Sequence, residues 1–166
     1  MEPLRVTPTR RRFLQGAAAC GLAALPLPAL AETRAAEAVL GQWYRLLIEL
    51  IRNTATYSPP VAARSFAYLG ITAFEALATG NASLRSLAGQ VPELAPLPAR
   101  EAAPHDEALV LDAALGAAMA VLFGNTGPMG LRAMEAMRSD MAETLEAGLG
   151  PDLVARSRAH GALVAQ

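Results

Sequence analysis

Residues 35–52, AAEAVLGQWYRLLIELIR, and residues 58–80, SPPVAARSFAYLGITAFEALATG, decide the fold class of this chain. In the first stretch apolar side chains recur at the three-to-four spacing of one helix face. They are Val39, Leu40, Trp43, Leu46, Leu47, Leu50 and Ile51. Charged residues such as Arg45 and Glu49 fall on the opposite face. The first stretch is therefore predicted to form an amphipathic helix.

The second stretch predicts a helix that begins at Ser58 and ends at about Thr79. The Ser58 hydroxyl can accept a hydrogen bond from a free amide of the first turn, proline suits that turn, and Gly80 marks the end. The side chains are apolar or small nearly all round, which is typical of a buried helix. Arg64 and Glu75 lie about three turns apart and share a face. A solvated or ion-paired stripe is the commoner explanation for this pair, and one edge of a pocket is the other.

Three further helices are predicted along the rest of the chain. Four prolines make residues 91–104 a loop, and Asp106 caps a helix that stops at Gly124. The next helix covers about residues 129–147, with methionines that fill core rather than bind metal, and the last begins near Asp152. No alternating run of useful length occurs, so the fold class is all-α. We expect about five helices that form part of a larger helical bundle.

The first thirty-one residues are predicted to be an export signal. Thr9-Arg10-Arg11-Arg12-Phe13-Leu14-Gln15 matches the twin-arginine pattern and precedes an apolar run that ends in Ala29-Leu30-Ala31, a small-x-small cleavage site. Glycine and proline dilute the run, so no stable membrane anchor is expected. A lipoprotein site at Cys20 is disfavoured because cleavage there would leave an apolar terminus. The expected partners of residues 1–31 are the twin-arginine translocase and a signal peptidase, and the expected location is periplasmic or secreted.

Residues 32–166 form one predicted helical domain, with ten arginines, fourteen acidic residues and a net charge of about −4. This mildly negative net charge does not favour binding to nucleic acid. All cationic side chains of the sequence are arginine, and the absence of lysine excludes Schiff bases, P-loops and lysine general bases. The last helical pattern continues to Gln166 without a cap or a polar tail. We therefore expect the domain to be the truncated N-terminal part of a larger one.

Four segments of the domain resemble a known family. Residues 43–47 (WYRLL), 52–64 (RNTATYSPPVAAR) and 67–76 (AYLGITAFEA) resemble the N-terminal helices of bacterial vanadium-dependent haloperoxidase-like proteins of the type 2 phosphatidic acid phosphatase (PAP2) superfamily. Residues 157–161 (SRAHG), followed by residues 164–165, resemble a later helix of that family. The resemblance implies a bundle of the vanadium haloperoxidase and acid phosphatase type.

The resemblance also implies which residues the family's chemistry needs: a lysine, two arginines, a Ser-Gly-His element and a distal histidine. Such a cradle neutralises the oxygens of vanadate or of a transferring phosphoryl group, while the histidines attack, ligate or move protons. The chain has no lysine and no Ser-Gly-His, and neither His105 nor His160 stands in the required context. In residues 156–160 (RSRAH) the histidine follows too soon. We therefore expect no catalytic, cofactor-binding or metal-binding residue here, and vanadate only in a full-length relative.

The histidines and carboxylates have plainer explanations. His105 is expected to be an exposed turn or cap residue, and His160 a packed or hydrogen-bonded one. Two histidines alone make no zinc site, which takes three or four ligands. We expect no catalytic role for the acidic groups. Asp106, Glu107 and Asp112 are interpreted as a helix N-terminal cluster, and Glu143 and Glu146 are interpreted as part of a solvated face.

Two functions of different class follow from the sequence. The first is an exported helical scaffold portion of a PAP2 or haloperoxidase-like protein, inactive by itself because the catalytic segment is missing. The alternative is a small non-catalytic periplasmic helical protein that binds a partner. The DNA that follows the reading frame separates them, because only the first predicts a segment there with the lysine, arginines and histidines of the cradle.

Overall fold

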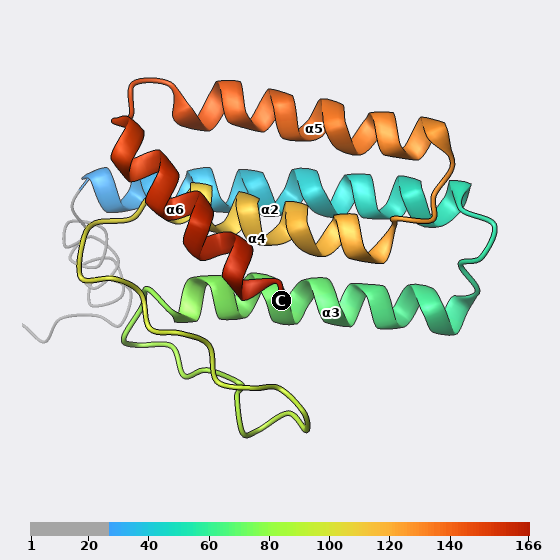
Figure 1. Cartoon of the computed structure of the whole chain (residues 1–166), viewed down its shortest axis with the longest axis horizontal. Helices are drawn as coiled ribbons and strands as arrows, with labels where there is room; N and C mark the ends of the chain where they lie inside the picture. Colours follow the sequence, from blue (N-terminus) through green and yellow to red (C-terminus); the bar gives the residue numbers. More distant parts are fainter. Residues whose placement is uncertain (1–26) are drawn as a thin grey trace, which may run out of the picture.

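The computed structural model describes residues 27–166, with side chains from residue 35 onward. The predicted signal falls largely outside these residues, which include only its last part, residues 27–31. The described chain forms five α-helices and no strand, so the predicted all-α class is confirmed (Figure 1). The helices are α2 (Leu27–Asn53), α3 (Pro59–Ala78), α4 (Glu107–Leu122), α5 (Pro128–Glu146) and α6 (Pro151–Val164).

Helix α4 is the centre of the fold. It packs against α2, α3, α5 and α6, and Figure 1 shows α6 crossing it obliquely. Side chains all round its circumference are buried, among them Ala108, Leu109, Val110, Leu111 and Leu115. A helix without a polar face needs neighbours on every side. Only α4 has them in this structure.

The prediction that residues 58–80 form a helix buried all round is wrong. Helix α3 packs mainly against α4 and meets α6 at one end, so the structure covers only part of its circumference. Leu69 and Ala73 face the core, whereas Val61 is 39% exposed and Tyr68 is 51% exposed. The composition of a helix shows which of its side chains can be buried. The number of neighbouring helices decides which of them are buried.

The hydrophobic core lies where α2, α3 and α4 meet. Trp43 and Leu47 of α2, Leu69 of α3, and Leu115 and Met119 of α4 are fully buried in one cluster. Each such side chain contributes about 1.5–3 kcal/mol relative to an exposed one. The apolar face predicted for residues 35–52 is therefore the face that α2 packs against the other helices.

Only part of the apolar face predicted for residues 129–147 packs against α4 and α2. Met134 and Met141 are buried, as the core interpretation of the methionines requires. Met129 and Leu131, near the beginning of the helix, are exposed. Helix α5 contacts α4 and α2 along one narrow stripe, so residues beside that stripe face solvent.

The helix ends follow local chemistry. Asp106 caps α4 as predicted, because its side chain accepts a hydrogen bond from the Leu109 amide at 2.9 Å. Ser58 is the N-cap residue of α3 as predicted, but its hydroxyl makes no capping hydrogen bond. Proline at the first two positions of α3 leaves few amides within reach of that hydroxyl. Helix α6 ends at Val164, and does not continue to Gln166 as the pattern predicted.

Glycine allows α6 to approach α4 closely. A Cβ atom placed on Gly161 would collide with the Val110 carbonyl oxygen and lie 2.7 Å from the Ala113 Cβ. Residues 79–106 connect α3 to α4 without regular secondary structure except one isolated bridge between Ala88 and Val91, which agrees with the proline-rich loop predicted there. No helix among the described residues is long and apolar enough to cross a membrane.

Candidate functional site

The polar side chains of the described chain concentrate where α3 ends, α4 begins and α6 crosses both. We call Thr79, Arg100, His105, Glu107 and His160 the polar junction. These residues come from the end of α3, the 79–106 connection, the first turn of α4, and α6. His105, Glu107 and His160 were each interpreted separately from the sequence. Thr79 and Arg100 were not predicted to belong to a site, because nothing local marks their long-range pairing.

Arg100 is the centre of the polar junction. Its guanidinium pairs with both carboxylate oxygens of Glu107, and the Nη2–Oε2 distance is 2.9 Å. Nη2 also donates to the Ala76 carbonyl oxygen at 2.7 Å, and Nε donates to Thr79 Oγ1 at 3.1 Å. A Cβ on Gly80 would collide with this guanidinium. A nearly buried arginine therefore joins the end of α3 to the beginning of α4.

His160 is buried on the same threonine, which confirms that it is a hydrogen-bonded packing residue. Its Nε2 lies 3.0 Å from Thr79 Oγ1. The Thr79 hydroxyl also lies 2.9 Å from the Ala76 carbonyl oxygen, and when its proton points there, Nε2 of His160 is the donor to Thr79. Burial is the main cause that lowers the pKa of His160, and the charges of Arg100 and His105 add to it, while Glu107 acts in the opposite direction.

His105 is half-buried against His160, so the prediction of an exposed turn residue is wrong. The two rings meet edge to face with their centroids 5.6 Å apart. Nδ1 of His105 donates to the Ala103 carbonyl oxygen at 2.8 Å, which leaves the Nε2 lone pair free in the neutral ring. The two histidines, 55 positions apart in the sequence, thus form one side of the polar junction.

Residues 156–160 attach α6 to the rest of the bundle. Arg156 Nε donates to the Pro104 carbonyl oxygen at 2.9 Å, and the buried Ser157 hydroxyl accepts from the Asp106 amide at 2.9 Å. With His160 on Thr79, these bonds hold α6 against both α3 and the beginning of α4. The polar side chains of this segment therefore connect helices.

Asp112 lies in a second, buried network. Its Oδ1 accepts from the Trp43 indole at 2.9 Å, and its Oδ2 lies 3.4 Å from Arg158 Nη1. Arg158 Nε also donates to Glu146 at 2.6 Å, and its buried Nη2 has no partner among the described residues. Burial raises the pKa of Asp112, and the indole hydrogen bond and Arg158 oppose that rise.

The helix N-terminal cluster predicted from Asp106, Glu107 and Asp112 is confirmed for the first two residues and wrong for Asp112. Asp106 is the cap of α4, Glu107 pairs with Arg100, and Asp112 pairs with Trp43 and Arg158 on another side of the helix. Residues five or six positions apart on a helix face different neighbours. The three carboxylates have different neighbours because other helices pack around α4 on every side.

Glu75 and Arg64 also have different surroundings, although they lie on one stripe of α3. Arg64 is exposed, whereas Glu75 is only 2% exposed and accepts from the Ser86 hydroxyl at 2.8 Å and the Leu87 amide at 2.6 Å. The 79–106 connection folds back over the end of α3 that carries Glu75. The stripe is solvated at Arg64, as predicted for the commoner case, whereas Glu75 lines two cavities, as the pocket-edge alternative predicted.

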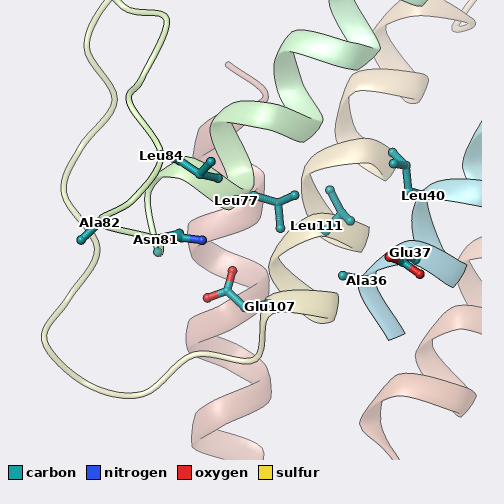
Figure 2. Close-up of a pocket in the computed structure, with 10 residues that line it drawn as sticks. Ala36, Glu37, Leu40, Leu77, Asn81, Ala82, Leu84, Glu107 and Leu111 are labelled. Atoms are coloured by element: carbon teal, nitrogen blue, oxygen red, sulfur yellow. The ribbon is translucent and has the colours of Figure 1, made fainter. Parts of the chain in front are cut away.

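Three cavities border the polar junction. The first, of about 620 Å³, is lined by apolar side chains from α2, α3, α4 and the connection, including Leu40, Leu77 and Leu111. Figure 2 shows these side chains with the carboxylates of Glu37 and Glu107 at its edge. The second, of about 540 Å³, contains both histidines, and the third, of about 590 Å³, contains Thr79 and Arg100.

The geometry of the polar junction is suited to holding helices together. The described residues contain no group of three or more histidine, cysteine, aspartate or glutamate side chains that could hold a metal ion. His160 and Thr79 are close enough for a base and a nucleophile. The Thr79 oxygen, however, accepts from the Arg100 cation and from His160, and its proton is directed at a carbonyl oxygen. An activated nucleophile needs the opposite arrangement, with a base that accepts its proton.

Searches against protein-family models, curated proteins and solved structures found no match to this chain.

Proposed function

We propose that this chain is the helical scaffold portion of an exported PAP2 or haloperoxidase-like protein, and that it holds a further helical segment on which the reactive residues lie. The observation that supports the proposal most directly is an uncovered apolar groove between α3 and α4. We call it the open groove and define it by Tyr68, Ile71, Val121, Leu122 and Val164.

The open groove is the part of the α3–α4 pair that α6 does not cover. Helix α6 crosses α4 and reaches the middle of α3, where it ends (Figure 1). Beyond it Tyr68 is 51% exposed and Val121 is 78% exposed, beside a cavity of about 430 Å³. The exposed apolar side chains on adjacent helices line one cavity, and this arrangement supports the proposal that another element packs there.

An amphipathic helix is the occupant that fits this surface. The open groove runs between two packed helices, and the ridges of a third helix fit such a groove. One of the segments that resemble the PAP2 family, residues 67–76, also forms part of its wall through Tyr68 and Ile71. In the proposed arrangement the docked segment carries the oxyanion cradle, and the chain alone is inactive.

Co-expression of the chain with the polypeptide encoded after its reading frame tests the proposal. We expect that polypeptide to contain the lysine, arginines, Ser-Gly-His and distal histidine of the cradle and to purify with the chain. We expect the pair to hydrolyse p-nitrophenyl phosphate, or to oxidise bromide with peroxide and vanadate. Phosphatase or haloperoxidase activity of the chain alone, or an unrelated downstream sequence, would contradict the proposal. An unrelated sequence would favour the non-catalytic binding protein.

Substitutions in the open groove test where the segment docks. The double variant Tyr68→Glu with Val121→Glu places charge on an apolar contact and is expected to abolish co-purification. Leu131→Glu is the matched control, because Leu131 is 46% exposed and lies on α5 outside the groove. Equal loss of binding in the control, or retained binding in the double variant, would refute docking in the open groove.

We also propose that residues 1–31 direct the chain through the twin-arginine pathway. Replacing Arg10 and Arg11 with lysine keeps the positive charge and removes the arginine pair. The variant should accumulate in the cytoplasm, whereas replacing Arg5 and Arg12 with lysine should leave export unchanged. Fractionation of cells followed by immunoblotting measures both outcomes, and equal export of the two variants would contradict this proposal.

A further inference from the structure

We propose that the polar junction is an acid-sensitive latch, in which protonation of His160 releases α6 and the 79–106 connection from the end of α3. The proposal goes beyond the scaffold function, because it concerns how the described helices are held together. It depends on the position of one buried imidazole beside the Arg100–Glu107 ion pair and on the hydrogen bond between this imidazole and Thr79.

The charged and titratable groups around His160 come from every element packed against it. The 79–106 connection contributes Arg100, Glu101 and His105, and α4 contributes Glu107. Helix α6 itself contributes Asp152 and Arg156, and α3 ends at the uncharged Thr79. On the inner side lie the Arg100–Glu107 ion pair and His105, while Glu101 and Asp152 are exposed to water.

Glu107 is poorly placed to compensate for a proton on His160. Both of its carboxylate oxygens already pair with Arg100. A protonated His160 would therefore add a cationic group beside Arg100, in a position that is only 6% exposed. Burying a charge without a free partner is costly, and the structure can avoid that cost by moving the ring into water. Such a movement breaks the bond to Thr79.

The same bond is what connects α6 to α3. The other side-chain bonds of this part of α6 reach the connection and the beginning of α4, through Arg156 to Pro104 and through Ser157 to Asp106. Without the His160 bond, Thr79 loses one of its two donors, and Arg100 loses part of the packing that surrounds it. We expect the release to include the connection as well as α6.

The direction of the pH effect follows from linkage. Burial and Arg100 lower the pKa of His160 below its ordinary value of about 6.5. The stability that neutral His160 contributes is therefore fully present above pH 6.5 and is lost as the pH falls through the lowered pKa. The raised pKa of Asp112 has the opposite sign, because protonating a buried carboxylate favours the folded state. Asp112 does not cause the acid effect.

Nuclear magnetic resonance and unfolding experiments on the full chain test the latch. The sequence has two histidines, so the variant His105→Gln assigns both imidazole Cε1–H signals. We expect the His160 signal to titrate below pH 6.5 and the unfolding equilibrium constant to rise between pH 7.5 and 5.0 by at most about 30-fold, the limit set by an unfolded-state pKa of about 6.5. His160→Gln keeps a donor for Thr79 without a titrating ring, and its pH dependence should be flatter.

The matched variant His105→Gln removes the neighbouring histidine and should retain most of the acid effect. Hydrogen exchange gives the local readout: residues 79–106 and 151–164 should lose protection at pH 5.0 relative to α2 in the wild type and keep it in His160→Gln. A His160 titration at or above pH 6.5 in the wild type would overturn the proposal even if a variant fails to fold. An equal pH dependence in wild type and His160→Gln would do the same.

Discussion

The two ends of the α3–α4 pair are covered in different ways. At the end of α3 that meets the beginning of α4, the polar junction and α6 close the surface with hydrogen bonds and an ion pair. At the opposite end, the open groove leaves Tyr68 and Val121 exposed. Polar contacts need specific partners, whereas an apolar groove accepts any surface of matching shape. The first end is suited to fixing the fold, and the second to accepting another helix.

The largest effect is expected where α6 approaches α4. Gly161→Ala should destabilise the chain by about 3 kcal/mol, because the new methyl group overlaps the Val110 carbonyl oxygen and the helices must separate. Gly41→Ala is the control, since no neighbouring atom lies within 4 Å of its added Cβ. It should stabilise α2 by about 0.5–1 kcal/mol through helix propensity. Chemical denaturation measures the free energy of unfolding of both variants. An unchanged value in Gly161→Ala would show that α6 and α4 can separate without loss of stability.

The next effect concerns the ion pair of the polar junction. Arg100→Ala leaves the Glu107 carboxylate partly buried without its partner, and should cost about 2 kcal/mol. In the exposed pair of Arg52 with Glu49 the arginine side chain is 68% exposed. Arg52→Ala should therefore change the free energy of unfolding by less than about 0.5 kcal/mol. Equal effects in the two variants would mean that the polar junction is no more important than a surface pair.

The smallest effect is expected in the open groove. Val121→Ala removes two methyl groups that are already in water, and should change stability by less than about 0.5 kcal/mol. Val110→Ala, the same substitution at a fully buried position of the same helix, should cost about 2 kcal/mol. Thermal unfolding followed by circular dichroism measures the pair. A large loss in Val121→Ala would show that the groove is already filled.

The elements of this fold were predictable because their signals are local. The spacing of Trp43 and Leu47, the cap at Asp106 and the prolines of the 79–106 connection each act within a few residues. The centre of the bundle was not predictable in the same way. Residues 58–80 and 107–122 are both apolar on most sides, and only the number of neighbouring helices makes α4 the buried one.

Little of the candidate site was predictable, because most of its contacts join residues that are far apart in the sequence. His160 was correctly expected to be hydrogen bonded, because a histidine on an apolar helix needs a partner. Its partner Thr79 is 81 positions away, and Trp43 is 69 positions from Asp112. No short-range pattern encodes such pairs. Arg100 in particular looked like one more charged residue after a proline-rich segment.

Trp43 gives this chain an optical reporter of its own centre. It is the single tryptophan of the sequence, its side chain is fully buried between α2 and α4, and its indole nitrogen is held by Asp112. Because the emission of an indole depends on the water and charge around it, the fluorescence of the wild-type chain reports on one place, the contact of α2 with α4. The three tyrosines, by contrast, lie at different places, with Tyr57 stacked on Phe123 and Tyr68 exposed in the open groove. The tryptophan emission is therefore the signal that reports on a single site, without any attached dye.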